Sequence, residues 1–175
     1  MTYEIEIGRS KRAAQAYSLD DVAIVPNRRT RDPQDVSVTW QIDAYKFETP
    51  ILGAPMDSVM SPATAIALGK LGGLGVLNLE GLWTRYEDPA KVLEEIAALE
   101  SANGGHFDPA ITARLQELYA APIQPELITA RLAEIRDAGV TVAGSLTPQR
   151  TQEHYKTVVA AGVDVFVIRG TTVSA

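Results

Sequence analysis

Small and polar residues recur at four points of the sequence, each directly after a short apolar run. The first is the segment GAPMDSV at 53–59, and the others lie at 78–81, 144–146 and 169–172. Glycine lets a backbone approach a ligand closely, and hydroxyls and backbone N–H groups can hold polar atoms. Loops in general favour such residues, so each group alone fits a plain turn equally well. Together they predict a ligand-binding site, provided that the fold brings all four to one place.

Residues suited to thiol or metal chemistry are scarce. The chain has no cysteine, which excludes disulfides, thiolate metal sites and a cysteine nucleophile within its 175 residues. Its two histidines, His106 and His154, are not spaced as metal ligands, and surface positions suit them better. Asp20 and Asp21 form an acidic pair without a third ligand, which favours a cap or a solvated turn. We therefore expect no metal site.

Two motifs that could bind phosphate are better explained structurally. The glycine-rich segment GGLG at 72–75 lies between a helix pattern and a strand pattern. The dinucleotide-binding fingerprint has the reverse order, because its glycines open a helix, so segment 72–75 is predicted to end one. Arg28, Arg29 and Arg31 could meet a phosphate or an acidic partner, although a solvated loop or a subunit contact is the favoured interpretation.

Composition and charge limit the partners that can be expected. Hydrophobic residues make up 46% of the chain and charged residues 22%, as in ordinary soluble globular proteins. The formal net charge of −6 argues against nucleic acid and anionic membranes as partners. Apolar runs stay well below the ~18 residues of a membrane span, and the charged, alternating N-terminus is unlike a signal peptide. We therefore expect a cytoplasmic protein.

The first part of the chain, residues 1–49, is predicted to be a β-rich preamble. Residues 3–7 alternate apolar and acidic side chains, which is the pattern of a half-buried strand. Residues 36–47 alternate again on both sides of Asp43-Ala44, which predicts a β-hairpin with its turn at these two residues.

From residue 50 to residue 175, short apolar strands alternate with helices. Strands are expected at 50–54, 74–77, 140–143 and 163–168, and helices at 61–71, 88–100, 108–120, 125–138 and 147–162. Apolar strands separated by helices indicate a parallel sheet covered by helices, either doubly wound or a (βα)8 barrel. Four strands in about 120 residues amount to half of such a barrel. In both architectures the ligand site lies at the carboxyl ends of the strands.

Three segments of the sequence resemble the IMP dehydrogenase/GMP reductase family. They are SLDDVAIVP at 18–26, PILGAPMDSVMSPATAIALGKLGGLGVLN at 50–78 and AGVDVFVI at 161–168. The chain is most similar to the shorter branch of the family, which lacks the inserted pair of CBS domains. A helical segment at about 82–138 occupies the place of that insertion. The resemblance implies an α/β fold, the N-terminal half of a (βα)8 TIM barrel.

The resemblance also implies a function and a substrate site. The family chemistry is purine-nucleotide oxidoreduction, and the IMP dehydrogenase type converts IMP to XMP with NAD (or NADP) in guanine nucleotide biosynthesis. Carried over to this sequence, the purine mononucleotide (IMP or GMP) contacts Ala54, Met56 and Asn78. Asp57 is expected to hold the loop by accepting backbone hydrogen bonds. A homo-oligomer of the tetramer type is implied as well.

The implied cofactor contacts are Arg169, Gly170 and Thr171, and here the chain departs from the family pattern. Arg169 stands in place of an aspartate that holds the nicotinamide ribose, although arginine suits a phosphate or a carboxylate better than a diol. Asn78-Leu79 stand where dehydrogenases often carry a histidine pair. The alternatives are therefore a GMP reductase or a non-catalytic nucleotide-binding or regulatory relative. The nucleophilic cysteine is expected beyond residue 175, so the 175 residues alone are predicted to be inactive.

Overall fold

The structure, a computed structural model, describes residues 4–7, 9, 11–14, 16–25, 32–102 and 108–170. The chain forms two compact units, Met1–Ser37 and Val38–Ala175. The division falls earlier than the boundary at 49/50 that was expected from the sequence, because the hairpin before residue 49 packs on the sheet of the second unit.

The first unit contains little regular structure. Strands β1 (Glu4–Ile7) and β2 (Lys11–Ala14) pair antiparallel, which confirms a strand over the described part of 3–7 and adds a partner that was not predicted. Two 3₁₀ turns follow, at Leu19–Asp21 and Pro33–Asp35. In the first, the Ser18 hydroxyl accepts from the Asp20 N–H and the Asp21 carboxylate accepts from the Ser18 N–H, both at 3.2 Å. The acidic pair is thus part of a helix cap, as expected.

The second unit opens with the predicted hairpin. Strands β3 (Trp40–Ile42) and β4 (Tyr45–Phe47) pair antiparallel, and the turn between them contains Asp43 at a φ of 49°. The hairpin is confirmed, although residues 36–39 are not part of the strand. The rings of Trp40 and Phe47 stack with their centroids 4.7 Å apart.

The sheet of the second unit has four parallel strands. They are β5 (Leu52–Gly53), β6 (Leu74–Asn78), β7 (Ala143–Leu146) and β8 (Val165–Ile168), and they are hydrogen-bonded in the order β5-β6-β7-β8. Sequential parallel strands joined through helices give the predicted α/β half-barrel. The third strand lies at 143–146 and not at 140–143, and the first is shorter than the predicted 50–54.

Three helices make the crossovers between neighbouring strands: α1 (Pro62–Lys70), α4 (Pro125–Asp137) and α5 (Pro148–Ala160). Each begins with proline, whose missing N–H costs nothing in the first turn. The hydroxyl groups of Ser61 and Thr147 accept backbone N–H groups there, as the N-cap patterns predicted. Helix α1 ends at Lys70 and is followed by Leu71 as C-cap and by Gly72, whose φ of 82° suits glycine, so segment 72–75 terminates a helix as expected.

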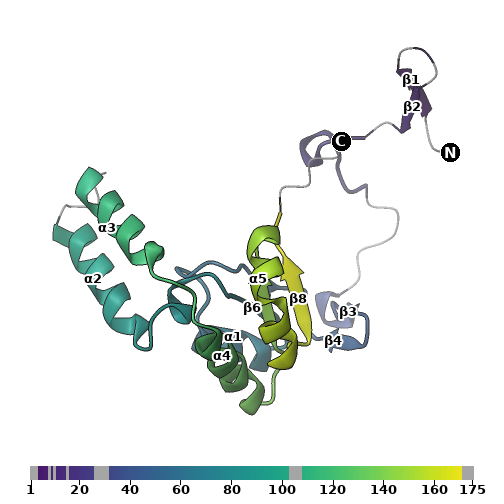
Figure 1. Cartoon of the computed structure of the whole chain (residues 1–175). Helices are drawn as coiled ribbons and strands as arrows, with labels where there is room; N and C mark the ends of the chain where they lie inside the picture. Colours follow the sequence, from purple (N-terminus) through teal and green to yellow (C-terminus); the bar gives the residue numbers. More distant parts are fainter. Residues whose placement is uncertain are drawn as a thin grey trace. The chain divides into compact units, whose positions relative to one another are not determined.

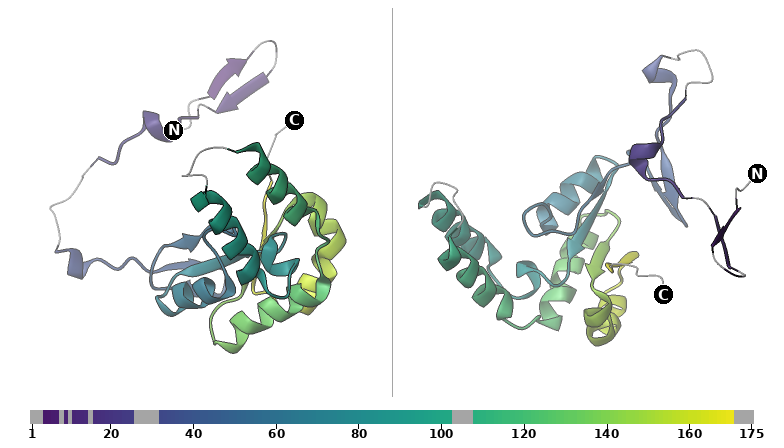
Figure 2. Two further views of the ribbon diagram at one scale, coloured as in Figure 1. Left: turned by 90° about the vertical axis from the view of Figure 1, so that its left-hand side faces the viewer. Right: turned by 90° about the horizontal axis from the view of Figure 1, so that it is seen from above.

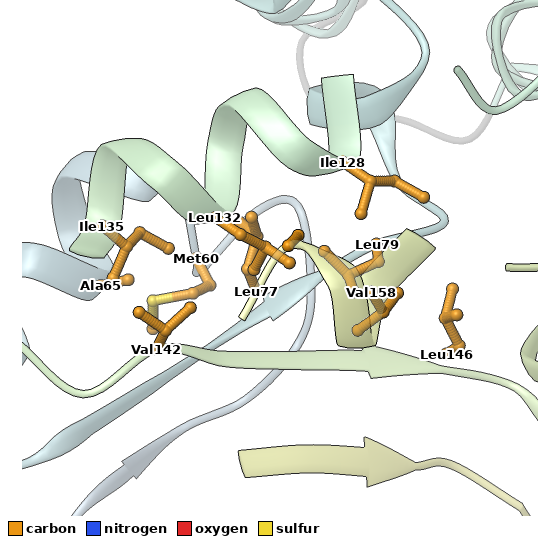
Figure 3. Packing of buried hydrophobic residues seen from close by; sticks show 11 residues of the cluster. Met60, Ala65, Leu77, Leu79, Ile128, Leu132, Ile135, Val142, Leu146 and Val158 are labelled. Atoms are coloured by element: carbon orange, nitrogen blue, oxygen red, sulfur yellow. The ribbon is translucent and has the colours of Figure 1, made fainter. Parts of the chain in front are cut away.

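The main core lies between these helices and one face of the sheet (Figure 3). Side chains from α4, the strands and the segment before α1 point toward one another, and Leu77, Ile128 and Leu132 are fully buried. Burial of one such side chain is worth about 1.5–3 kcal/mol. On the opposite face, the β3–β4 hairpin covers Leu74, Val76 and Ala143 through Phe47.

The remaining helices, α2 (Pro89–Ala102) and α3 (Pro109–Ala120), follow a 3₁₀ turn at Leu82–Thr84. They lie side by side, away from the sheet (Figures 1 and 2). The Arg114 guanidinium joins them by donating to the Glu95 carboxylate at 2.7 Å. Since α4 is a buried crossover helix, only α2 and α3 of the helical segment predicted at 82–138 lie outside the barrel layer. No helix in the described part of the chain has both the length and the apolar character needed to cross a membrane.

Candidate functional site

The carboxyl ends of the four parallel strands lie along one rim of the half-barrel. The register pairs Asn78 of β6 with Ser145 of β7, and Leu146 of β7 with Ile168 of β8. The segment after β5 reaches the same rim, because Arg169 donates to the carbonyl oxygen of Pro55 at 3.2 Å. The predicted convergence of the four strand ends is therefore confirmed, although only Arg169 and Gly170 of the group 169–172 are described. The group 144–146 forms the end of strand β7 itself, so Thr147 is the first residue beyond that strand.

Arg169 connects three of the strand ends. One terminal nitrogen donates to Pro55, and the other donates to the Asn78 side-chain oxygen at 3.0 Å and lies 3.7 Å from the Glu80 carboxylate. The Glu80 side chain is only 16% exposed, and it also accepts a hydrogen bond from the backbone N–H of Thr147. A planar fork with several fixed donors suits this kind of cross-link better than a lysine would. Arg169 is thus a structural tie of the rim.

Asp57 is the second residue that links separate segments of the rim by hydrogen bonds. Its carboxylate accepts from the backbone N–H of Leu82 at 2.9 Å, as expected for a residue that fixes this loop. It also accepts from the Tyr119 hydroxyl at 2.6 Å and, weakly, from the Asn78 amide at 3.4 Å. A Cβ on Gly81 would lie 1.8 Å from a carboxylate oxygen of Asp57. The lack of a side chain at position 81 therefore makes room for this carboxylate.

The two methionines near the loop have different environments. Met60 is 3% exposed and belongs to the main core, whereas Met56 is 52% exposed and Ala54 is also exposed. The backbone N–H groups of Met56 and Met60 close two successive turns, at 2.8 Å to the Ala54 oxygen and 2.7 Å to the Met56 oxygen. The loop is thus internally ordered while it presents Ala54 and Met56 to solvent at the rim.

The structure describes two of the three predicted cofactor residues, Arg169 and Gly170. Arg169 is engaged within the rim, and Gly170 is exposed beside the start of α5, where an added Cβ would meet the Pro148 ring at 3.1 Å. Thr171 lies outside the described residues, as do Arg28, Arg29, Arg31 and His106. Ser145 is fully buried on β7, and its hydroxyl has no hydrogen-bond partner among the described residues.

Two residues of the rim were missed at the sequence level, Tyr119 and Arg85. The Arg85 guanidinium lies 6.0 Å from the centre of the Tyr119 ring and donates to the Glu80 carbonyl at 2.9 Å. Burial, and next the nearby Arg150 charge, lower the pKa of Arg85. Burial first, and then the hydrogen bond to Asp57 and its charge, raise the pKa of Tyr119, so the phenol stays a protonated donor. No local sequence signal connects either residue with the loop at 54–60.

Histidine, aspartate and glutamate are the side chains of this protein that could serve as metal ligands. Among the residues that the structure describes, no three of these side chains come together in a way that could hold an ion. The chemistry available at the rim is therefore that of neutral polar groups, backbone amides, two arginines and two engaged carboxylates.

This fold and this rim define the class of protein: the first half of a (βα)8 barrel with a candidate ligand site at the carboxyl ends of its strands. A family model described as the IMP dehydrogenase/GMP reductase domain matches residues 16–173. The chain belongs to the IMP dehydrogenase/GMP reductase family. The resemblance inferred from its motifs is thereby confirmed.

Similar proteins extend well beyond this chain. An "uncharacterized oxidoreductase" of Mycolicibacterium smegmatis is 49% identical over 172 residues, which are 98% of this chain and 45% of that protein. An inosine-5'-monophosphate dehydrogenase of Methanocaldococcus jannaschii is 44% identical over 66 residues, which are 38% of this chain and 13% of that protein.

Among solved structures, an IMP dehydrogenase/GMP reductase-like protein of Corynebacterium glutamicum is similar, with a TM-score of 0.81 and 44% identity. The match covers 98% of this chain and 45% of that chain. The chain therefore spans a little under half the length of the relatives that it matches over nearly all its residues.

Proposed function

We propose that this chain is the N-terminal half-barrel of a purine-nucleotide oxidoreductase of the IMP dehydrogenase type. In the proposed reaction IMP, NAD+ and water give XMP, NADH and a proton: the hydride from C2 of the purine passes to NAD+, and the oxygen of water is bonded to C2 in the product. The observation that carries the proposal is the loop at 54–60. It lies at the strand-end rim, is bonded to the rest of the rim through its own Asp57 and through Arg169, and leaves Ala54 and Met56 exposed to solvent.

The exposed side chains of the loop suit a purine. Met56 offers a flexible, polarisable thioether that packs well against aromatic rings. The Asn78 oxygen is occupied by Arg169 and by the Glu80 N–H, at 3.0 and 3.2 Å. Among the described residues, its amide nitrogen has only the long contact to Asp57, which leaves a donor for a polar atom of the nucleotide.

The cofactor assignment needs revision at one residue. A guanidinium has no acceptor atoms, and the terminal nitrogens of Arg169 already bind Pro55 and Asn78, so this side chain does not fit the role of a ribose ligand. We assign it to holding the loop instead. Contact of a nicotinamide dinucleotide with Gly170 and Thr171 stays a proposal based on family membership, as does assembly into a homo-oligomer.

A second candidate reaction is the reduction of GMP by NADPH. The hydrogen bond between Arg169 and Asn78 favours it. Both residues differ from those expected at these positions in a dehydrogenase, and in this structure they bind each other. Such a paired change indicates that this part of the rim has a different task from the one in ordinary dehydrogenases.

The test uses the full-length protein. Turnover is measured with IMP plus NAD and separately with GMP plus NADPH, by absorbance of the reduced nicotinamide. Activity with IMP supports the first candidate and activity with GMP the second. Binding of purine nucleotide without turnover would favour the non-catalytic nucleotide-binding relative, and absence of both turnover and binding would contradict both reactions and the proposed site.

A pair of methionine variants tests the site itself. Met56→Ala is expected to raise the KM for the nucleotide about five- to tenfold without changing the melting temperature, because this side chain is half exposed. Met60→Ala is the matched control, because its side chain is buried in the core. It is expected to cost about 2–5 kcal/mol of stability. A large loss of stability in Met56→Ala with unchanged KM would place Met56 in the core instead.

A further inference from the structure

The C-terminal end of α3 reaches the loop at 54–60 from a distant part of the sequence. The Tyr119 hydroxyl donates to Asp57 at 2.6 Å across 62 residues of sequence. This is the short distance typical of a hydroxyl bound to a carboxylate. We propose that Tyr119 is a positioning residue for this loop, through which the α2–α3 pair sets the affinity of the nucleotide site. The inference rests on the proposed function and deepens it.

The end of α3 is itself fixed at the rim by several contacts. Arg85 donates to the carbonyl oxygen of Ala121, and the Tyr86 hydroxyl donates to the carbonyl oxygen of Leu118 at 2.9 Å. The backbone N–H of Gln124 donates to the Thr84 oxygen at 2.8 Å. These bonds tie the residues on both sides of Tyr119 to the segment that leaves β6. These bonds therefore fix the position from which the Tyr119 side chain reaches Asp57.

The carboxylate that Tyr119 binds controls the loop backbone. Asp57 lies within the turn from Met56 to Met60 and directly after the turn from Ala54 to Met56, and its other strong bond is to the backbone N–H of Leu82. The Leu82 N–H and the Tyr119 hydroxyl donate to the same carboxylate oxygen of Asp57. Without the Tyr119 bond, Asp57 keeps the bond from Leu82 but loses the one from α3. The loop would then be free to shift relative to the remaining rim, and with it Ala54 and Met56.

The α2–α3 pair meets the rim at the end of α3, where the other bonds reach the segment after β6 and, among the described residues, only the Tyr119 bond reaches the loop at 54–60. It packs mainly on itself, through Arg114 and Glu95, and on the 3₁₀ turn at Leu82–Thr84. Figures 1 and 2 show both helices to one side of the strand layer, with α3 returning toward the rim. Tyr119 is the residue by which the orientation of this pair is transmitted to the loop.

The experiment compares Tyr119→Phe with Tyr86→Phe in the full-length protein. Both remove one hydroxyl at the same end of α3, but only the first removes a bond to Asp57. Binding of IMP and of GMP is measured by calorimetry, and hydrogen exchange of the amides at 54–60 by mass spectrometry. Tyr119→Phe is expected to weaken nucleotide binding about three- to tenfold and to speed exchange in the loop by a similar factor. Tyr86→Phe is expected to change both much less than Tyr119→Phe does, because Arg85 and the Gln124 backbone still hold the end of α3 and the bond to Asp57 stays.

Gly81→Ala provides an independent approach to the same carboxylate. Its added Cβ would displace Asp57, so it is expected to act in the same direction as Tyr119→Phe. The double variant is expected to show little further loss of nucleotide affinity, because both changes act through one group. In turnover, the KM for the nucleotide should rise while kcat stays nearly constant.

The outcomes separate the two proposals. If the wild-type protein binds neither IMP nor GMP, the proposed function fails, and faster loop exchange in Tyr119→Phe alone would still support the positioning role. If the wild-type protein binds nucleotide and Tyr119→Phe matches it in both affinity and loop exchange, the positioning role is overturned. Equal losses in Tyr119→Phe and Tyr86→Phe would also overturn it, because they would indicate a general effect on α3.

Discussion

Replacement of Arg169 by methionine removes the hydrogen bonds between the strand ends while keeping an unbranched apolar stem. Two hydrogen bonds from a charged donor are lost, to Pro55 and to Asn78, and the nearby Glu80 carboxylate loses its cationic neighbour. Bonds of this type contribute about 1.5–3 kcal/mol each when shielded from water. The Arg169 side chain is 34% exposed, so the sum must be reduced for solvent screening, to about 2 kcal/mol in total.

The measurement is thermal unfolding of the 175-residue chain. A loss of about 2 kcal/mol corresponds to a decrease in melting temperature of about 4–8 °C for a chain of this size. Arg169→Lys is the matched control, because it retains the positive charge beside Glu80 but not the planar fork. We expect it to lose about half as much. A decrease below 1 °C in Arg169→Met would refute the reasoning, because it would mean that these bonds do not hold the rim together.

Three further predictions follow from buried and charged groups and from the missing nucleophile. Ser145→Ala is expected to leave the melting temperature unchanged or to raise it, because the buried hydroxyl has no partner among the described residues; a marked decrease would indicate one. The hydrogen bond from Arg114 is the main cause that lowers the pKa of Glu95. This bond therefore stabilises the folded chain above the unfolded pKa of about 4.3, and the stabilisation is lost as the pH falls through the folded-state pKa of Glu95. Wild-type chain should therefore lose more helical circular dichroism between about pH 5 and pH 3 than Glu95→Gln, and parallel curves would count against this. The 175 residues alone should not turn over IMP with NAD or GMP with NADPH, since the covalent route needs a thiolate and the chain has no cysteine; steady nicotinamide turnover would contradict that route.

Local patterns in the sequence determined most of the fold. The Ser61-Pro62 and Thr147-Pro148 pairs marked two helix starts correctly, because capping depends on groups only a few residues apart. The hairpin around Asp43 and the order of parallel strands were also predicted correctly. The third strand was placed three residues early, because Val140 and Thr141 are as compatible with a strand as Leu146 is.

The sequence also located the loop at 54–60 and, through parallel topology, the rim on which it lies. It could not show that α4 is a crossover helix and that only α2 and α3 lie outside the barrel layer, because all three helices have similar apolar periodicity. The difference arises from burial, since Ile128, Leu132 and Ile135 of α4 are fully buried in the main core. Burial of this kind depends on which face another element covers.

Only the tertiary structure decided what the polar residues of the rim do. Arg169 was expected to touch a cofactor, yet it binds Pro55 across 114 residues and Asn78 across 91. Tyr119 carried no local signal at all, and its role depends on a 2.6 Å contact with Asp57. Hydrogen bonds require partners within a few tenths of an ångström and in a favourable direction. Such distances are set by the packing of whole elements, so residue types and spacing along the chain do not determine them.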